Sequence, residues 1–89
     1  MANAFMINEM DSIATVTEAV GSGETVHVAM DGKVTDITAL DPIPKYHKIA
    51  VCPVKKGDNV YKYGEVIGHA TQDIRVGNHV HVQNLTDKE

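Results

Sequence analysis

Histidines are the residues of this sequence whose type and spacing could do chemistry. Four of the five lie in or beside one repeated phrase in the second half of the chain. His79 and His81 are two positions apart, so on a β-strand both side chains would point to the same face. Two imidazoles on one face could bind an anionic substrate, or a metal ion with His69 as a third ligand. They could equally be exposed positions of an alternating strand whose inward residues are Val80 and Val82.

Two phrases that contain lysine add candidate binding groups. His47 and Lys48 open a predicted strand directly after a proline-containing connector, and residues next to loops are often functional. Lys62, Tyr63 and Gly64 form a predicted turn, where the ammonium group could bind a carboxylate through charge-assisted hydrogen bonds. Both phrases could also be exposed polar surface.

The tyrosines and the cysteine have simpler interpretations. Tyr46, Tyr61 and Tyr63 could form a small hydrophobic cover or a protein interface. Cys52 precedes a proline and is expected to pack rather than to act as a nucleophile. As the single cysteine, it excludes an intramolecular disulfide and a cysteine-rich zinc site.

Short alternating segments that position these residues predict a mainly β fold. The phrase Ala50–Val60 is repeated at Ala70–Val80, with apolar residues, a glycine and a valine at matching places. Asp31-Gly32 lies between two alternating runs and predicts a β-hairpin. Residues 8–14 could hold one helical turn at most, and Asp41–Lys45, with its prolines, reads as an extended connector. The predicted strands, separated by glycine turns, are 13–20, 25–30, 33–38, 47–54, 65–71 and 79–83.

Length and charge limit the class of protein. A chain of 89 residues is expected to form one domain, residues 1–89, with a modest core. The net charge of −4 argues against a nucleic-acid partner. No signal peptide is visible, and no apolar run approaches the roughly 20 residues that span a bilayer. A cytoplasmic protein without a membrane partner is therefore expected.

Three phrases together resemble the SAF domain of the altronate/galactarate dehydratase family. The phrases are H-K-I-A at 47–50, V-Y-K-Y-G-E-V-I-G at 60–68 and G-N-H-V-H-V-Q-N-L at 77–85. They are similar to the family's H-K-I-A, I-x-K-Y-G-x-x-I-G and I-x-x-G-x-x-V-H-x-H-N, in the same order. The resemblance implies a β-clip fold and a role beside a much larger catalytic region that dehydrates sugar acids. Tyr46 stands where the family usually has glycine, and Gln83 where it usually has the second histidine of H-x-H-N.

The resemblance also implies roles for individual residues. His47, Lys48 and His81 are the expected catalytic residues. The expected metal pair, His79 with His81, rests on their shared strand face and not on the resemblance. Substrate binding is expected from Lys62, Tyr63, Gly64, His69 and Asn84. No cofactor is expected on the isolated chain, and the family's iron would lie mainly with the large subunit.

Two classes of function remain open from the sequence. In the first, the chain is the separate small subunit of a hydro-lyase that acts on altronate, galactarate or a similar sugar acid. The sulfolactate sulfo-lyases, in which the SAF region is also separate, are the alternative within this class. In the second, the chain is a free-standing β-rich binding or carrier module, which would require a modifiable lysine such as Lys62. A homo-oligomer is compatible with either class.

Overall fold

The computed structural model describes residues 3 to 87, and this part of the chain is built from strands without a helix. The mainly β prediction is confirmed. The strands are β1 (Ala4–Phe5), β2 (Ile13–Val16), β3 (Thr25–Met30), β4 (Lys33–Thr38), β5 (Lys48–Ala50), β6 (Asn59–Lys62), β7 (Glu65–Ala70), β8 (His79–Val80) and β9 (Leu85–Asp87).

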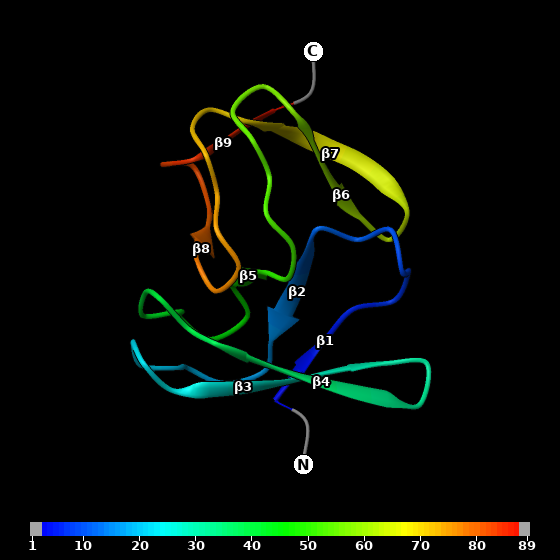
Figure 1. Cartoon of the computed structure of the whole chain (residues 1–89), viewed down its shortest axis with the longest axis vertical. Helices are drawn as coiled ribbons and strands as arrows, with labels where there is room; N and C mark the ends of the chain where they lie inside the picture. The colour runs from blue at the N-terminus through cyan, green and yellow to red at the C-terminus, as the bar shows by residue number, and fades with distance from the viewer. Residues whose placement is uncertain (1–2, 88–89) are drawn as a thin grey trace.

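The strands form two sheets, which lie one above the other in Figure 1. The larger sheet has the order β4-β3-β1-β2-β5-β8, and the smaller has the order β6-β7-β9. Neighbouring strands are antiparallel except β1 and β3, which pair in parallel. Asp31 and Gly32 join β3 to β4 with φ values of 50° and 80°, as a type I′ turn requires. The predicted hairpin is therefore confirmed.

Four turns of the chain follow one pattern, and the sequence repeat noted above is half of it. Each turn begins with an apolar residue, has a second apolar residue four positions later and has a residue with positive φ seven positions after the first. The four starting residues are Val16, Ala39, Ala50 and Ala70. We call the positive-φ residues the corner residues: Gly23 (φ 89°), Tyr46 (66°), Gly57 (90°) and Gly77 (96°). Three are glycines, the residue that tolerates this conformation best. Tyr46 is the exception.

The four turns pair two by two. The amide of Gly57 donates to the carbonyl of Ala70, and the amide of Gly77 donates to the carbonyl of Ala50. Gly23 with Ala39, and Tyr46 with Val16, repeat this exchange in the first half of the chain. Isolated bridges between Val54 and Ile74, and between Val20 and Ile43, close the two pairs. The fold thus contains two similar units, each made of two paired turns, which we call clasps. The first clasp is not visible in the sequence because a tyrosine replaces a corner glycine.

Each clasp has its own core. One cluster is built on β1 to β3 and the 39–49 turn, and it includes Val16, Val26 and Ile49. The other is built on the repeated phrases and includes Val60 and Val80. Strand β5 and its partner β8 contribute Ile49 to the first cluster and Val80 to the second, so this strand pair lies at the seam between the cores.

Four of the predicted strands are longer than the observed ones, whereas those predicted at 25–30 and 33–38 match β3 and β4. The segment predicted at 47–54 is a strand only over β5, and the segment predicted at 79–83 only over β8. Because the chain turns after Val80, Val82 does not alternate inward and is 79% exposed, so its inward placement is wrong. Strands β1, β6 and β9 were not predicted. The β-clip description and the single-domain boundary of 1–89 stay predictions.

Candidate functional site

Three imidazoles stack together at the seam between the two cores. The ring centroids of His47 and His81 are 4.8 Å apart, those of His47 and His79 5.1 Å, and those of His79 and His81 5.9 Å. We call these three side chains the histidine cluster. His47 and His79 are half-buried, whereas His81 is exposed. In the sequence His79 and His81 lie 32 and 34 positions after His47, and the fold brings the three side chains together.

Strand pairing explains the convergence. In the β5–β8 ladder, Lys48 lies opposite Val80 and Ile49 opposite His79. Continuing this antiparallel register by one residue brings His47 beside His81, and directly opposed side chains share a face. The 81–84 turn is held by Asn84, whose side chain accepts from the amide of His81 and donates to the carbonyl of His79 at 2.8 Å.

A chain of hydrogen bonds defines the proton positions in the cluster. The amide nitrogen of Gln83 lies 3.1 Å from the carbonyl oxygen of His79 and 3.3 Å from its Nδ1, so Gln83 can donate to both. Nδ1 of neutral His79 is then an acceptor, and its proton is on Nε2. Nε2 lies 2.9 Å from Nδ1 of His47 and donates to it. Neutral His47 therefore carries its own proton on Nε2.

Burial and neighbouring charges adjust the basicity of the cluster. Burial lowers the pKa of His79, as do His47, His81 and Lys48, while the carboxylate of Asp41 opposes them. Asp41 also accepts hydrogen bonds from the backbone amide of His79 and from the side chain of Asn78, each at 3.0 Å. The result is a neutral His79 at pH 7.

Lys48 and Lys62 lie near each other. Burial lowers the pKa of Lys48, and the ammonium group of Lys62 lowers it further. Among the residues whose side chains the structure describes, the one salt bridge joins His27 to Asp36 across β3 and β4. Because the chain as a whole is acidic, this pair of cations is a local departure from its charge.

Asp11 anchors the hairpin turn that carries Lys62. Its buried carboxylate accepts from the amide of Gly64 at 2.8 Å and from the amides of Ile7 and Asn8. Burial alone would raise the pKa of Asp11, but the backbone donors, including Tyr63, outweigh it and the pKa is lowered. The Tyr63-Gly64 turn is therefore pinned to the 8–11 loop, where a Cβ on Gly64 would lie 2.8 Å from the side-chain nitrogen of Asn8.

The structure separates some of the predicted site residues from the cluster. His69 lies on β7 in the smaller sheet, opposite Asn59 on one side and Thr86 on the other. The prediction that it joins His79 and His81 is therefore wrong. Asn84 is buried and bound to backbone groups, so its role is to position the two histidines. Gly64 serves the turn.

The geometry of the cluster does not favour a metal centre. Among the described residues, no group of three or more histidine, cysteine, aspartate or glutamate side chains is arranged to hold a metal ion. The facing nitrogens of His47 and His79 bond to one another, and glutamine is the next polar neighbour. The metal role of His79 and His81 stays a prediction, and no step below depends on it.

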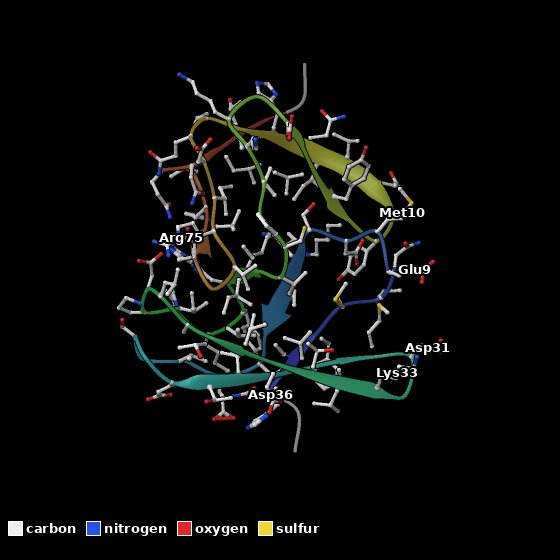
Figure 2. The ribbon with its side chains drawn as sticks, viewed as in Figure 1. Glu9, Met10, Asp31, Lys33, Asp36 and Arg75 are labelled. Carbon is white, nitrogen blue, oxygen red and sulfur yellow. The ribbon has the colours of Figure 1, made fainter. Side chains whose placement is uncertain are left out.

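Two cavities differ in what they offer a ligand. One, of about 390 Å³, adjoins the cluster and is lined by polar side chains that include Asp41, His79 and Gln83. The other, of about 340 Å³, is mostly apolar and contains Met6, Met10 and Met30 in its wall. Figure 2 shows Glu9 and Met10 on the N-terminal loop, facing Asp31 and Lys33 at the β3–β4 tip on that side of the molecule. Of the site residues predicted from the sequence, His79 and Asn84 line the first cavity.

Comparison with known proteins identifies the family. The family model described as "Altronate/galactarate dehydratase SAF domain" matches residues 2–88. The chain belongs to this family.

The relatives of this SAF domain are of two kinds. Altronate dehydratase of Bacillus subtilis is 36% identical over 84 residues, which cover 94% of this chain but 16% of that protein. The (2R)-sulfolactate sulfo-lyase subunit alpha of Paracoccus pantotrophus is 43% identical over 61 residues, covering 68% of this chain and 91% of the relative. The corresponding subunit of Chromohalobacter salexigens is 33% identical over 92 residues, covering 99% and 98%. The SAF domain thus spans about one sixth of the altronate dehydratase it matches and nearly all of the sulfo-lyase subunits.

Sequence reasoning missed three residues that shape the site of this SAF domain. Asp11 accepts a hydrogen bond from the turn that follows Lys62, and Asp41 accepts one from the backbone amide of His79. Gln83 donates to the ring of His79 and so determines its tautomer. Only Gln83 left a signal, because it departs from the family phrase at the position next to the cluster.

No helix within residues 3–87 is long and apolar enough to cross a membrane.

Proposed function

We propose that this SAF domain is the small component of a carbon–oxygen lyase that acts on a sugar acid together with a larger catalytic chain. The observation that carries the proposal is the histidine cluster, with Lys48 close enough to lower the pKa of His79. Relatives named altronate dehydratase contain a matching segment within a much longer protein, which supports a larger partner.

The cluster supplies the groups that a β-elimination needs. A base removes the proton next to the substrate carboxylate, and an acid assists departure of the leaving group. Lys48 suits the base, since burial and Lys62 lower its pKa. The acid would be a protonated imidazole, for which exposed His81 is the candidate, and neutral His47 can donate a hydrogen bond from Nε2 to the same ligand.

Lys62 and Tyr63 complete the binding groups. The ammonium group of Lys62 can bind the substrate carboxylate, and charge-assisted hydrogen bonds of this kind contribute about 1.5–3 kcal/mol each. The large chain would supply the rest of the pocket, and any iron chemistry would lie with it. The protein is proposed to act in the cytoplasm.

Sulfite elimination from sulfolactate is the second candidate. It is favoured by one observation, the match over nearly the whole length of two proteins named sulfo-lyase subunit alpha. The same base and anion-binding groups serve either reaction, because only the leaving group differs. Altronate, galactarate and sulfolactate should therefore be assayed side by side.

The test is purification of the protein from its native host, identification of the co-purifying chain and assay of the complex. His81→Ala is expected to reduce turnover about 100-fold, the typical contribution of a general acid, and Lys62→Ala roughly 10- to 100-fold through loss of a charge-assisted hydrogen bond. His69→Ala, on the smaller sheet, is the matched histidine control and should retain activity. Full activity in both site variants, or the absence of any large chain, would overturn the proposal.

A further inference from the structure

Two tyrosines occupy backbone conformations that tyrosine disfavours. Tyr46 has φ 66° and Tyr63 has φ 56°, both in the left-handed region where a Cβ is crowded by the backbone. At the three other corners equivalent to Tyr46 the residue is glycine. The fold itself therefore provides a residue better suited to this position, and the chain does not use it.

Neither ring contributes to the core in return for this strain. Tyr46 is 66% exposed and Tyr63 is 56% exposed. Each ring instead lies beside a neighbouring ammonium group, with Lys45 Nζ 5.0 Å from the Tyr46 centroid and Lys62 Nζ 4.8 Å from that of Tyr63. Residues held in a strained conformation without a packing role are characteristic of functional surfaces.

The two tyrosines adjoin candidate site residues in the sequence. Tyr46 directly precedes His47 and Lys48, and Tyr63 directly follows Lys62. Exposed tyrosines are among the residues that contribute most to binding energy in protein interfaces. A partner chain that contacts both His47 and Lys62 would therefore lie close to both rings.

We propose that Tyr46 and Tyr63 are the aromatic anchors through which this SAF domain docks on the large catalytic chain. The inference rests on the proposed function and adds the contact that assembles the site. The partner surface would offer a pocket for each ring, with a carboxylate beside the Tyr46 pocket that pairs with Lys45. This lysine, on a chain of net charge −4, makes an acidic partner surface the complementary one there.

Glycine substitution separates docking from stability. Tyr46→Gly and Tyr63→Gly remove the ring and also relieve the positive-φ strain. We expect each variant to melt at the same temperature as the wild type or a few degrees higher, about the shift that relief of this strain produces. We also expect each to bind the purified large chain at least about tenfold more weakly, as loss of an interface anchor does.

The chain offers a matched control. Asp31, the third non-glycine residue with positive φ, lies at the β3–β4 tip, across the molecule from β8 in Figure 1. Asp31→Gly is the control for Tyr46→Gly and should leave the affinity for the large chain unchanged. Tyr46→Phe and Tyr63→Phe keep the ring and should bind nearly as the wild type does.

Each outcome decides the matter. Wild-type affinity in the two tyrosine-to-glycine variants would refute the anchors while leaving the proposed function standing. A melting temperature lowered by the glycine substitutions would show that the rings support the fold, against the inference. If the wild-type protein binds no large chain at all, the proposed function fails and the anchors fail with it.

Discussion

His79 is the imidazole whose surroundings are most fully defined. Its ring lies between Gln83 and His47, and its backbone amide is held by Asp41. Because burial and nearby positive groups lower its pKa, the folded protein resists protonation of His79. In the unfolded chain His79 has its ordinary pKa. Between the folded and the unfolded pKa of His79, the unfolded chain therefore binds more protons than the folded chain.

This linkage predicts a loss of stability in mildly acidic solution. As the pH falls below about 6.5, the unfolded value, the free energy of unfolding should decrease until the lower folded pKa is passed. Urea unfolding of the wild type and of His79→Gln between pH 5 and 8 measures it. The decrease in unfolding free energy with falling pH should be smaller in His79→Gln than in the wild type. His69→Gln should keep more of the wild-type decrease. Identical slopes in the wild type and His79→Gln would contradict the assignment.

Asp11 has the opposite linkage. Its folded pKa is below the ordinary value of 3.8, so its contribution is present above that pH and is lost as the pH falls through the folded pKa. Asp11→Asn should lower the free energy of unfolding by about 1–3 kcal/mol at pH 7, since buried backbone donors lose a charged acceptor. The difference from the wild type should shrink near pH 3.

Glu9→Gln supplies the control for Asp11. Glu9 is an exposed carboxylate on the same loop, and its replacement should change stability by within about 0.5 kcal/mol. Equal effects of the two substitutions at pH 7 would show that the backbone hydrogen bonds of Asp11 do not hold the turn.

At the scale of elements, the corner glycines make a comparison within one molecule. Gly57 and Gly77 are equivalent in the repeat and have φ values of 90° and 96°. A Cβ on Gly57 would meet no atom within 4 Å, whereas on Gly77 it would lie 2.1 Å from the carbonyl oxygen of Thr38. A side chain at either position would meet the conformational penalty of a positive φ, but only a side chain at Gly77 would also collide with the backbone.

Alanine at the two corners should therefore have unequal effects. Gly57→Ala should destabilise the protein by about 1–2 kcal/mol, the penalty for an L-residue in the left-handed region. Gly77→Ala should destabilise it by more than about 3 kcal/mol, because the strand must also shift away from backbone. Thermal unfolding of both variants checks the order, and equal melting temperatures would contradict the close approach at Gly77.

The sequence predicts local elements better than their partners. The β3–β4 hairpin is correct because Asp31-Gly32 defines its turn within two residues. The parallel pairing of β1 with β3 depends on contacts between distant segments, which short alternating runs do not encode. The first clasp was missed because Tyr46 interrupts the glycine pattern that reveals the second. The site followed the same division, since family phrases identified His47 and His81 but not Asp11 or Asp41.

At the scale of the whole molecule, the seam between the two cores explains why the site is incomplete. Strands β5 and β8 use their apolar residues to join the two clusters, which leaves the polar ends of these strands at the surface. His81 is exposed, and the adjoining cavity is a surface recess with polar walls. A small acid bound there would stay in contact with water, in which charge-assisted hydrogen bonds are weak.

The isolated chain is therefore expected to turn over none of the candidate acids. Elimination needs the base, the acid and the substrate held together in a site that excludes water, and this domain is proposed to supply one wall of such a site. The measurement is formation of an α-keto acid from altronate or galactarate, or release of sulfite from sulfolactate, with the chain alone and with its large partner. Activity should require both chains, and His81→Ala should abolish most of it without changing the melting temperature. Turnover by the purified small chain alone would show that the histidine cluster is a complete active site.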